Sequence, residues 1–187
     1  MPKIVDHEER RKEILKKSFG FFAKKGYASA TMRNLSDELG ISTGTLYHYF
    51  RNKDALFAQM FEQISQEDVT LASAQIGTKD TLEEKLTALF DFLIENEQYF
   101  HNVFLMALDF YRQQPEDKKS DVLQHVVAHY RKGLREQLGV EIAGLDQVMF
   151  SLMSGLIFQR LMDPKKTSLS VHFHFVRMLA DLLKKAD

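Results

Sequence analysis

Residues 31 to 53, TMRNLSDELGISTGTLYHYFRNK, constrain the fold more than any other stretch of this chain. Thr31 can cap a short helix that has three apolar residues on one face. Gly40 stands where a left-handed residue ends such a helix, and Ser42 can cap a second one with two inward apolar residues four apart. A helix, a short glycine-containing turn and a second helix form a helix-turn-helix, whose second helix enters the major groove of DNA.

The outward face of the second helix carries hydroxyl groups and rings, without an acidic side chain that would repel phosphate. These side chains belong to Thr43, Thr45, Tyr47, His48 and Tyr49. Arg33, Arg51 and Lys53 flank the helix and can pair with backbone phosphates. We therefore predict binding to double-stranded DNA. The alternative is two surface helices of an ordinary bundle.

At this point the sequence resembles the TetR family of bacterial transcriptional regulators. The resemblance lies in residues 14 to 56, ILKKSFGFFAKKGYASATMRNLSDELGISTGTLYHYFRNKDAL, and is most specific in GTLYHYFRNKDAL. It implies a three-helix DNA-binding domain, a helical effector-binding domain and a homodimer. It assigns to the DNA surface Thr31, Arg33, Thr43, Thr45, Tyr47, Tyr49 and Lys53. We add His48, at a position where an aromatic side chain would also serve.

These residues divide into two expected roles. Contacts to phosphate from Arg33, Tyr47 and Lys53 would set the register of the protein on DNA. Thr43, Thr45 and His48 would lie nearer the base edges, and the absence of an exposed arginine on this helix favours partial readout of DNA shape.

The charge is distributed unevenly along a chain whose formal net charge is only −1. Residues 1 to 53 hold 11 Lys and Arg against 6 Asp and Glu, and the remainder holds 14 against 20. A basic head on an acidic body is typical of a protein that meets a polyanion at one end only.

The apolar pattern has a helical period throughout, so we predict an all-α fold of about nine helices. The first helix is expected from near His7 to Gly26, and a long fourth helix from the cap Asn52 to somewhere before Gly77. The fifth helix is expected to start at Asp80 or Thr81, and the sixth to stop before Pro115. The seventh is expected to end near Gly139 and the eighth before Pro164. Apolar residues from Leu169 to Leu183 mark the last helix. We place the domains at 1–53, for DNA binding, and 54–187, for effector binding and dimerisation.

Helices five to eight carry more large apolar residues than a compact bundle of this length needs. We predict that they line a mainly apolar cavity for a hydrophobic or amphipathic effector. The lining is expected to comprise Phe90, Phe104, Leu108, Tyr111, Phe150 and Met153, with His125 and His129 as its polar groups. The alternative is a well-filled core.

The last two helices have apolar residues on more than one side. Ser151 and Gly155 are small and four apart, which allows another helix to come close. The resemblance implies that these helices form a homodimer, with Leu156 and Leu179 as our candidates for the interface. A twofold dimer suits a palindromic operator. The alternative is that both helices are buried within one subunit.

Other chemistry has little support. His125 and His129, with His101 as a third ligand, have a spacing that can bind a metal, yet polar pocket or surface residues explain them more simply. There is no cysteine, phosphate-binding glycine loop or hydrolase motif, so we expect no enzyme, metal or cofactor. Without a visible signal peptide or membrane-spanning run, a cytoplasmic protein is expected.

The predicted function is a homodimeric transcriptional repressor released from its operator by a small molecule. Two alternatives stay open from the sequence. The protein could activate rather than repress, or it could be a helical ligand-binding or structural bundle that does not bind DNA.

Overall fold

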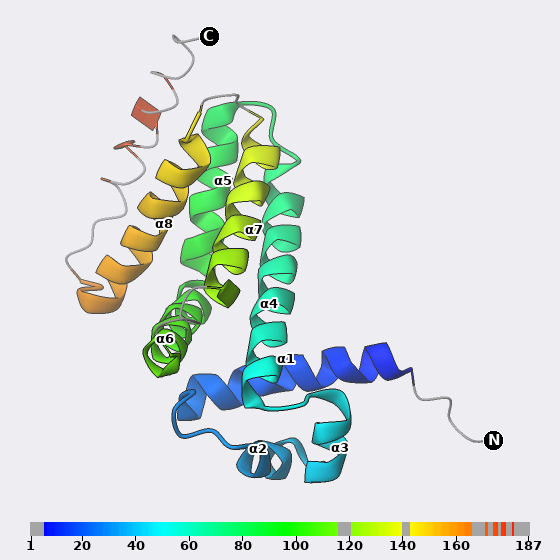
Figure 1. Cartoon of the computed structure of the whole chain (residues 1–187). Helices are drawn as coiled ribbons and strands as arrows, with labels where there is room; N and C mark the ends of the chain where they lie inside the picture. The colour runs from blue at the N-terminus through cyan, green and yellow to red at the C-terminus, as the bar shows by residue number, and fades with distance from the viewer. Residues whose placement is uncertain are drawn as a thin grey trace. The chain divides into compact units, whose positions relative to one another are not determined.

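The computed structural model of the chain describes residues 6–115, 121–139, 143–165 and six residues between 171 and 181. Over these residues the regular structure is entirely helical, which confirms the predicted all-α class (Figure 1). The helices are α1 (His7–Lys25), α2 (Met32–Leu39), α3 (Thr43–Tyr49), α4 (Lys53–Ile76), α5 (Leu82–Glu95), α6 (Glu97–Gln113), α7 (Asp121–Leu138) and α8 (Leu145–Met162). The residues that mark the predicted ninth helix, including Leu179, lie outside the described residues.

Side-chain caps begin most of these helices where the sequence predicts them. The Asp6 carboxylate accepts from the backbone N–H groups of the first turn of α1. Thr31 Oγ1 accepts from Asn34 N at 3.2 Å, and Asn34 Oδ1 accepts from Thr31 N at 2.8 Å. Asn52 Oδ1 accepts from the backbone N of Ala55 at 2.8 Å, in the first turn of α4. Each such contact satisfies a backbone donor that the helix itself cannot pair.

The chain packs into two compact units. The first holds residues 1–66 and 105–126, and the second holds residues 67–104 and 127–187. Helices α4, α6 and α7 each contribute residues to both units. The domain boundary expected near residue 53 stays a prediction.

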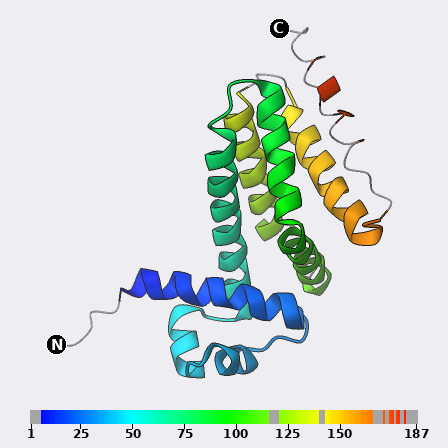
Figure 2. The same ribbon diagram turned by 180° about the vertical axis from the view of Figure 1, so that it is seen from behind.

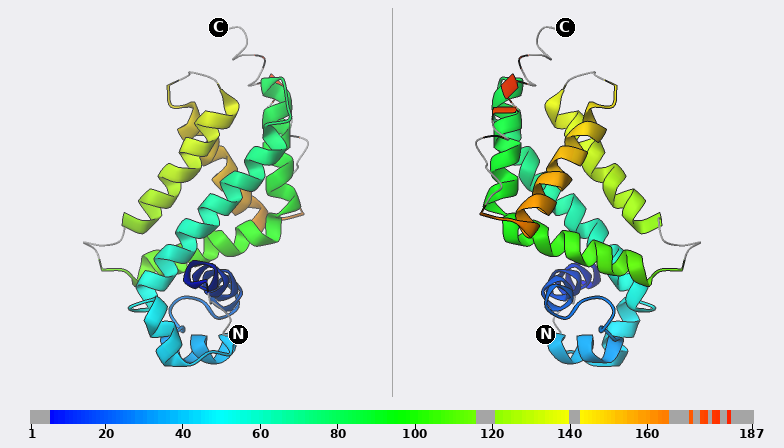
Figure 3. Two further views of the ribbon diagram at one scale, coloured as in Figure 1. Left: turned by 90° about the vertical axis from the view of Figure 1, so that its right-hand side faces the viewer. Right: turned by 90° about the vertical axis from the view of Figure 1, so that its left-hand side faces the viewer.

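The first unit is built on a cluster of aromatic rings. Phe57 is fully buried, and its ring centroid lies 4.6 Å from that of Phe110, 4.8 Å from Tyr27 and 5.1 Å from Phe22. Such ring pairs stabilise by about 0.5–1.5 kcal/mol beyond their area burial. Figure 3 shows α1 nearly end-on, with the short helices α2 and α3 beside it. The cluster therefore holds α1, α4 and the end of α6 as a base for the helix-turn-helix.

The second unit has an aliphatic core. Helices α5, α7 and α8 can be followed in Figure 2. They pack through Leu86, Leu89, Leu134 and Met149, all at most 6% exposed. Two ion pairs tie its helices together at the edge of the core. Arg160 binds the Glu97 carboxylate through two N–H groups at 2.8 and 2.6 Å, and Arg131 Nε donates to Asp146 Oδ2 at 2.8 Å. None of the helices within the described residues is both long and apolar enough to cross a membrane.

Replacing either of two helical glycines by alanine should change the stability of the protein, in opposite directions at the two positions. Gly20 in α1 is exposed, and a Cβ atom there would meet nothing within 4 Å, so Gly20→Ala should stabilise by about 0.5–1 kcal/mol. A Cβ on Gly133 in α7 would lie 2.8 Å from Val69 Cγ1, so Gly133→Ala should destabilise by about 1–3 kcal/mol. Thermal unfolding followed by circular dichroism checks both, and shifts of the same sign would contradict this account.

Candidate nucleic-acid interface

The turn between α2 and α3 is fixed by short-range contacts. Gly40 has φ 67° and ψ 32°, the left-handed conformation that the sequence predicts, and its N–H donates back to Asp37 O at 3.2 Å. Ser36 is buried, and its hydroxyl shares a 2.8 Å hydrogen bond with that of Thr43 on α3. Leu46, on the inner face of α3, is fully buried. The two helices thus form one rigid helix-turn-helix.

The face that α3 turns to solvent carries no acidic side chain. Tyr47 is 52% exposed, and Gly44 and His48 are also exposed. Thr45 is half-buried, and its hydroxyl shares a 2.8 Å hydrogen bond with that of Ser42, the residue that caps the helix. Tyr47, His48 and the bare backbone at Gly44 are therefore the exposed part of this face, and their contact with DNA stays a prediction. Gly44 was not among the residues predicted from the sequence to lie on the DNA surface.

The residues that flank α3 differ in their exposure to solvent. Thr31, Arg33 and Arg51 are exposed. Lys53 is half-buried, and its ammonium donates to Tyr27 O at 2.9 Å and lies 4.1 Å from the centroid of the Tyr27 ring. Burial lowers the pKa of Lys53. This side chain therefore fastens the start of α4 to the segment after α1, and its contact with DNA stays a prediction.

Tyr27 is the point at which several elements of the first unit meet. Its phenol donates to the Asp54 carboxylate, and burial raises its pKa. Its backbone N–H donates to Asp109 Oδ2 on α6 at 2.6 Å, and that of Ala28 donates to the same oxygen at 3.1 Å. One carboxylate on α6 thus holds the segment that leads into the helix-turn-helix.

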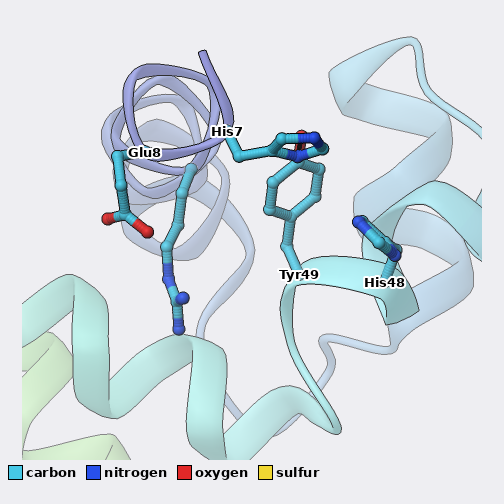
Figure 4. Close-up of a pocket in the computed structure, with 5 residues that line it drawn as sticks. His7, Glu8, His48 and Tyr49 are labelled. Atoms are coloured by element: carbon cyan, nitrogen blue, oxygen red, sulfur yellow. Dashed lines mark hydrogen bonds between the residues drawn. The ribbon is translucent and has the colours of Figure 1, made fainter. Parts of the chain in front are cut away.

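A shallow pocket of about 360 Å³ opens beside α3, between its end and the start of α1. Its lining comprises His7, Glu8, Arg11, His48 and Tyr49 (Figure 4). Three of these side chains are rings, with centroids 5.2 to 6.1 Å apart. The Tyr49 hydroxyl lies 3.3 Å from His7 Nδ1, within hydrogen-bonding distance. His7 could not be identified from the sequence, because its place beside α3 depends on how α1 packs.

Three of the residues predicted to line the effector cavity lie in the first unit. Leu108 and Tyr111 on α6 are 46% and 45% exposed, and His125 on α7 is also exposed. Among the described residues there is no group of three or more His, Cys, Asp or Glu side chains that could hold a metal ion.

The other five predicted cavity residues lie in the second unit. Phe90 is 2% exposed within the core, and Phe150 and Met153 pack against the same core while partly exposed. Phe104 on α6 has its ring 6.0 Å from that of Phe158. His129 has its Nε2 atom buried without a hydrogen-bond partner among the described residues. The grouping of these residues around a ligand stays a prediction.

A buried carboxylate in the second unit was not identified from the sequence. Asp68 on α4 is 5% exposed and accepts from the hydroxyls of Tyr99 at 2.8 Å and Tyr130 at 2.6 Å. Burial raises the pKa of Asp68 to about 6, although the two phenols act in the opposite direction. Burial also raises the pKa of both tyrosines.

Comparison with known proteins places this geometry in context. The family model described as bacterial regulatory proteins, tetR family, matches residues 14–60. The HTH-type transcriptional regulator PksA of Bacillus subtilis is 27% identical over 180 residues, covering 90% of this chain and 86% of that protein. An HTH-type transcriptional repressor of Mycobacterium tuberculosis is 39% identical over 77 residues, covering 40% of this chain and 41% of its own length.

The same architecture is found in solved structures. A transcriptional regulator from Saccharomonospora viridis, crystallised in complex with choline, superposes with a TM-score of 0.66 at 18% identity. The match covers 94% of this chain and 97% of that one. At this level of identity the likeness concerns the fold.

Proposed function

We propose, from the premise that this chain is a DNA-binding transcriptional regulator of the TetR family, that it is a homodimeric repressor released from a palindromic operator by a small molecule. The observation that carries DNA recognition is the acid-free outer face of α3, held rigid by the Ser36–Thr43 hydrogen bond. Tyr47 reaches the major groove from this face, with His48 beside it, and Arg33 on α2 binds a phosphate. The repressor named among the relatives supports the direction of regulation.

Helix α8 supports the homodimer. A stripe along one face of it consists of exposed residues spaced three and four apart, as at a helix–helix seam. The stripe comprises Val148, Ser151, Gly155, Phe158 and Met162. Val148, Phe158 and Met162 are 53%, 47% and 62% exposed, which is unusual for large apolar side chains in a row. A partner helix at Gly155 can approach closely because no side chain intervenes.

One interface candidate from the sequence was wrong. Leu156 is only 3% exposed and packs into the core of its own unit, so it cannot present its side chain to a second subunit. The neighbouring position Gly155 faces outward instead. Leu179, the other candidate, lies outside the described residues.

The second unit offers features that suit an effector. The buried Nε2 of His129 leaves a hydrogen bond unmade, which costs about 1–3 kcal/mol unless a ligand or water supplies it. Phe150 and Met153 add apolar surface beside the core. The choline bound to the neighbour from Saccharomonospora viridis supports a small-molecule site on this fold. The ligand would favour a dimer whose recognition helices no longer match successive major grooves, and DNA would weaken the ligand in return.

Arg33→Ala tests the phosphate contact. Because Arg33 is exposed and binds a phosphate rather than a base, its loss should weaken binding to every duplex about equally. The slope of log K against log salt should fall by about 0.9 per subunit. Operator duplexes are first selected from a random library and then titrated over a salt series. Lys165→Ala, at an exposed lysine in the second unit, is the control. Equal slopes for Arg33→Ala and wild type would contradict the proposed contact.

A further inference from the structure

The pocket beside α3 brings two histidines from distant parts of the chain to the DNA-reading surface. His7 is the first residue of α1, and His48 lies on α3, with ring centroids 5.8 Å apart. Figure 4 shows both imidazoles on the same side of α1, with Tyr49 extending from α3 toward the His7 ring. The Tyr49 hydroxyl, 3.3 Å from His7 Nδ1, orients the His7 ring so that its Nε2 remains available. The pocket therefore presents imidazole N–H groups next to the groove-facing side chains.

The other charged groups at this pocket are already engaged or turned away. Arg11 Nε donates to Gln59 Oε1 on α4 at 2.9 Å, and the guanidinium carbon lies 5.4 Å from the centroid of Phe50. This holds a permanent positive charge at the floor of the pocket. The Asp6 carboxylate accepts from the N–H groups of Glu8 and Glu9 in the first turn of α1. The side chain of Glu8 points to the opposite side of α1 from His7 (Figure 4).

We propose that His7 and His48 form a proton-dependent binding site for one DNA phosphate, which makes the affinity of this regulator for DNA rise as the pH falls. The proposed contact of α3 with DNA is the premise, since the phosphate reaches this pocket only when α3 lies in the groove. The site extends the DNA surface from the helix-turn-helix to the start of α1.

The direction of the pH effect follows from linkage. Histidine is the side chain whose charge ordinarily changes between pH 5 and 8. A bound phosphate stabilises the charged imidazoles, so DNA binding takes up protons, and protons in turn strengthen DNA binding. Charging this site adds one phosphate contact per subunit, which near 0.1 M salt multiplies the affinity by roughly five to ten for each subunit that binds.

The experiment uses a fluorescein-labelled mixed-sequence duplex of about 40 base pairs, because a phosphate contact does not depend on sequence. Binding is measured by anisotropy at pH 6 and pH 8 at constant ionic strength. Wild type should bind about tenfold or more tightly at pH 6. His7→Gln and His48→Gln should each lose a large part of this ratio, and His174→Gln, at an exposed histidine of the second unit, should retain it.

A permanently charged variant separates a phosphate site from a purely structural role. His7→Lys should bind at pH 8 more tightly than wild type, with a smaller pH ratio, whereas a disturbed α1 would weaken binding at both pH values. Calorimetry in two buffers of different ionisation enthalpy should find proton uptake on DNA binding for wild type and less for His7→Gln. Salt-dependent DNA binding with the same affinity at pH 6 and pH 8 would overturn the proton-dependent site alone. Absence of DNA binding at both values would overturn the regulator function and this site with it.

Discussion

Replacing Gly155 by Glu should convert the proposed dimer into monomers and lower the affinity for a palindromic operator by about 10³-fold or more. A Cβ atom at Gly155 meets nothing within 4 Å in its own subunit, so the substitution leaves the fold intact and should favour the helix. Between two α8 helices, the same side chain would place a charge among Val148, Phe158 and Met162 of the exposed stripe. A monomer keeps only one half-site, and therefore about half of the binding free energy.

Sedimentation velocity at micromolar concentration and titration with a selected operator measure these two effects. Ala74→Glu is a matched control, because it also replaces an exposed, small helical residue of the second unit by Glu. A wild-type monomer, or a Gly155→Glu variant that remains dimeric, would show that the exposed stripe on α8 is not the interface.

The helix-turn-helix could be predicted from the sequence because its determinants are local. The caps Thr31 and Ser42 accept hydrogen bonds from residues three positions ahead, and Gly40 adopts its left-handed conformation within a single turn. These choices depend on neighbours in the sequence and little on the rest of the fold. The same holds for most helix ends, which fall at the predicted glycines and before the predicted prolines.

The site residues beyond this window depend on contacts that sequence spacing does not reveal. His7 contacts Tyr49, which lies 42 positions away in the sequence, and Asp68 contacts Tyr130, which lies 62 positions away. Lys53 has the charge expected of a phosphate contact, yet its ammonium is held by Tyr27. For apolar residues, Leu156 is an example of a side chain whose direction could not be predicted from the sequence. Helix α8 is apolar on several faces, so its period cannot tell which residues face the core and which face a partner.

A substitution of Asp68 should produce the second large effect, because this carboxylate accepts hydrogen bonds from two phenols. Asp68→Ala should destabilise the protein by about 2–4 kcal/mol, because it leaves a cavity and removes the acceptor of Tyr99 and Tyr130. Asp68→Asn keeps an acceptor oxygen and a similar shape without the buried charge. It should therefore be close to wild type in stability, or above it, at pH 8.

The pH dependence of stability distinguishes the charge of Asp68 from its packing. Burial raises its pKa in the folded protein to about 6, against about 4 in the unfolded chain. The stability that Asp68 contributes is thus fully present below about pH 4 and is lost as the pH rises through 6. The free energy of unfolding of wild type, relative to Asp68→Asn, should fall by about 3 kcal/mol between pH 4 and pH 8. Urea unfolding of both proteins across this range measures the difference. The contributions of the other carboxyl groups to the pH dependence cancel in this difference. Parallel pH profiles would mean that the Asp68 carboxylate is ionised without penalty, and that its two phenols compensate fully for burial.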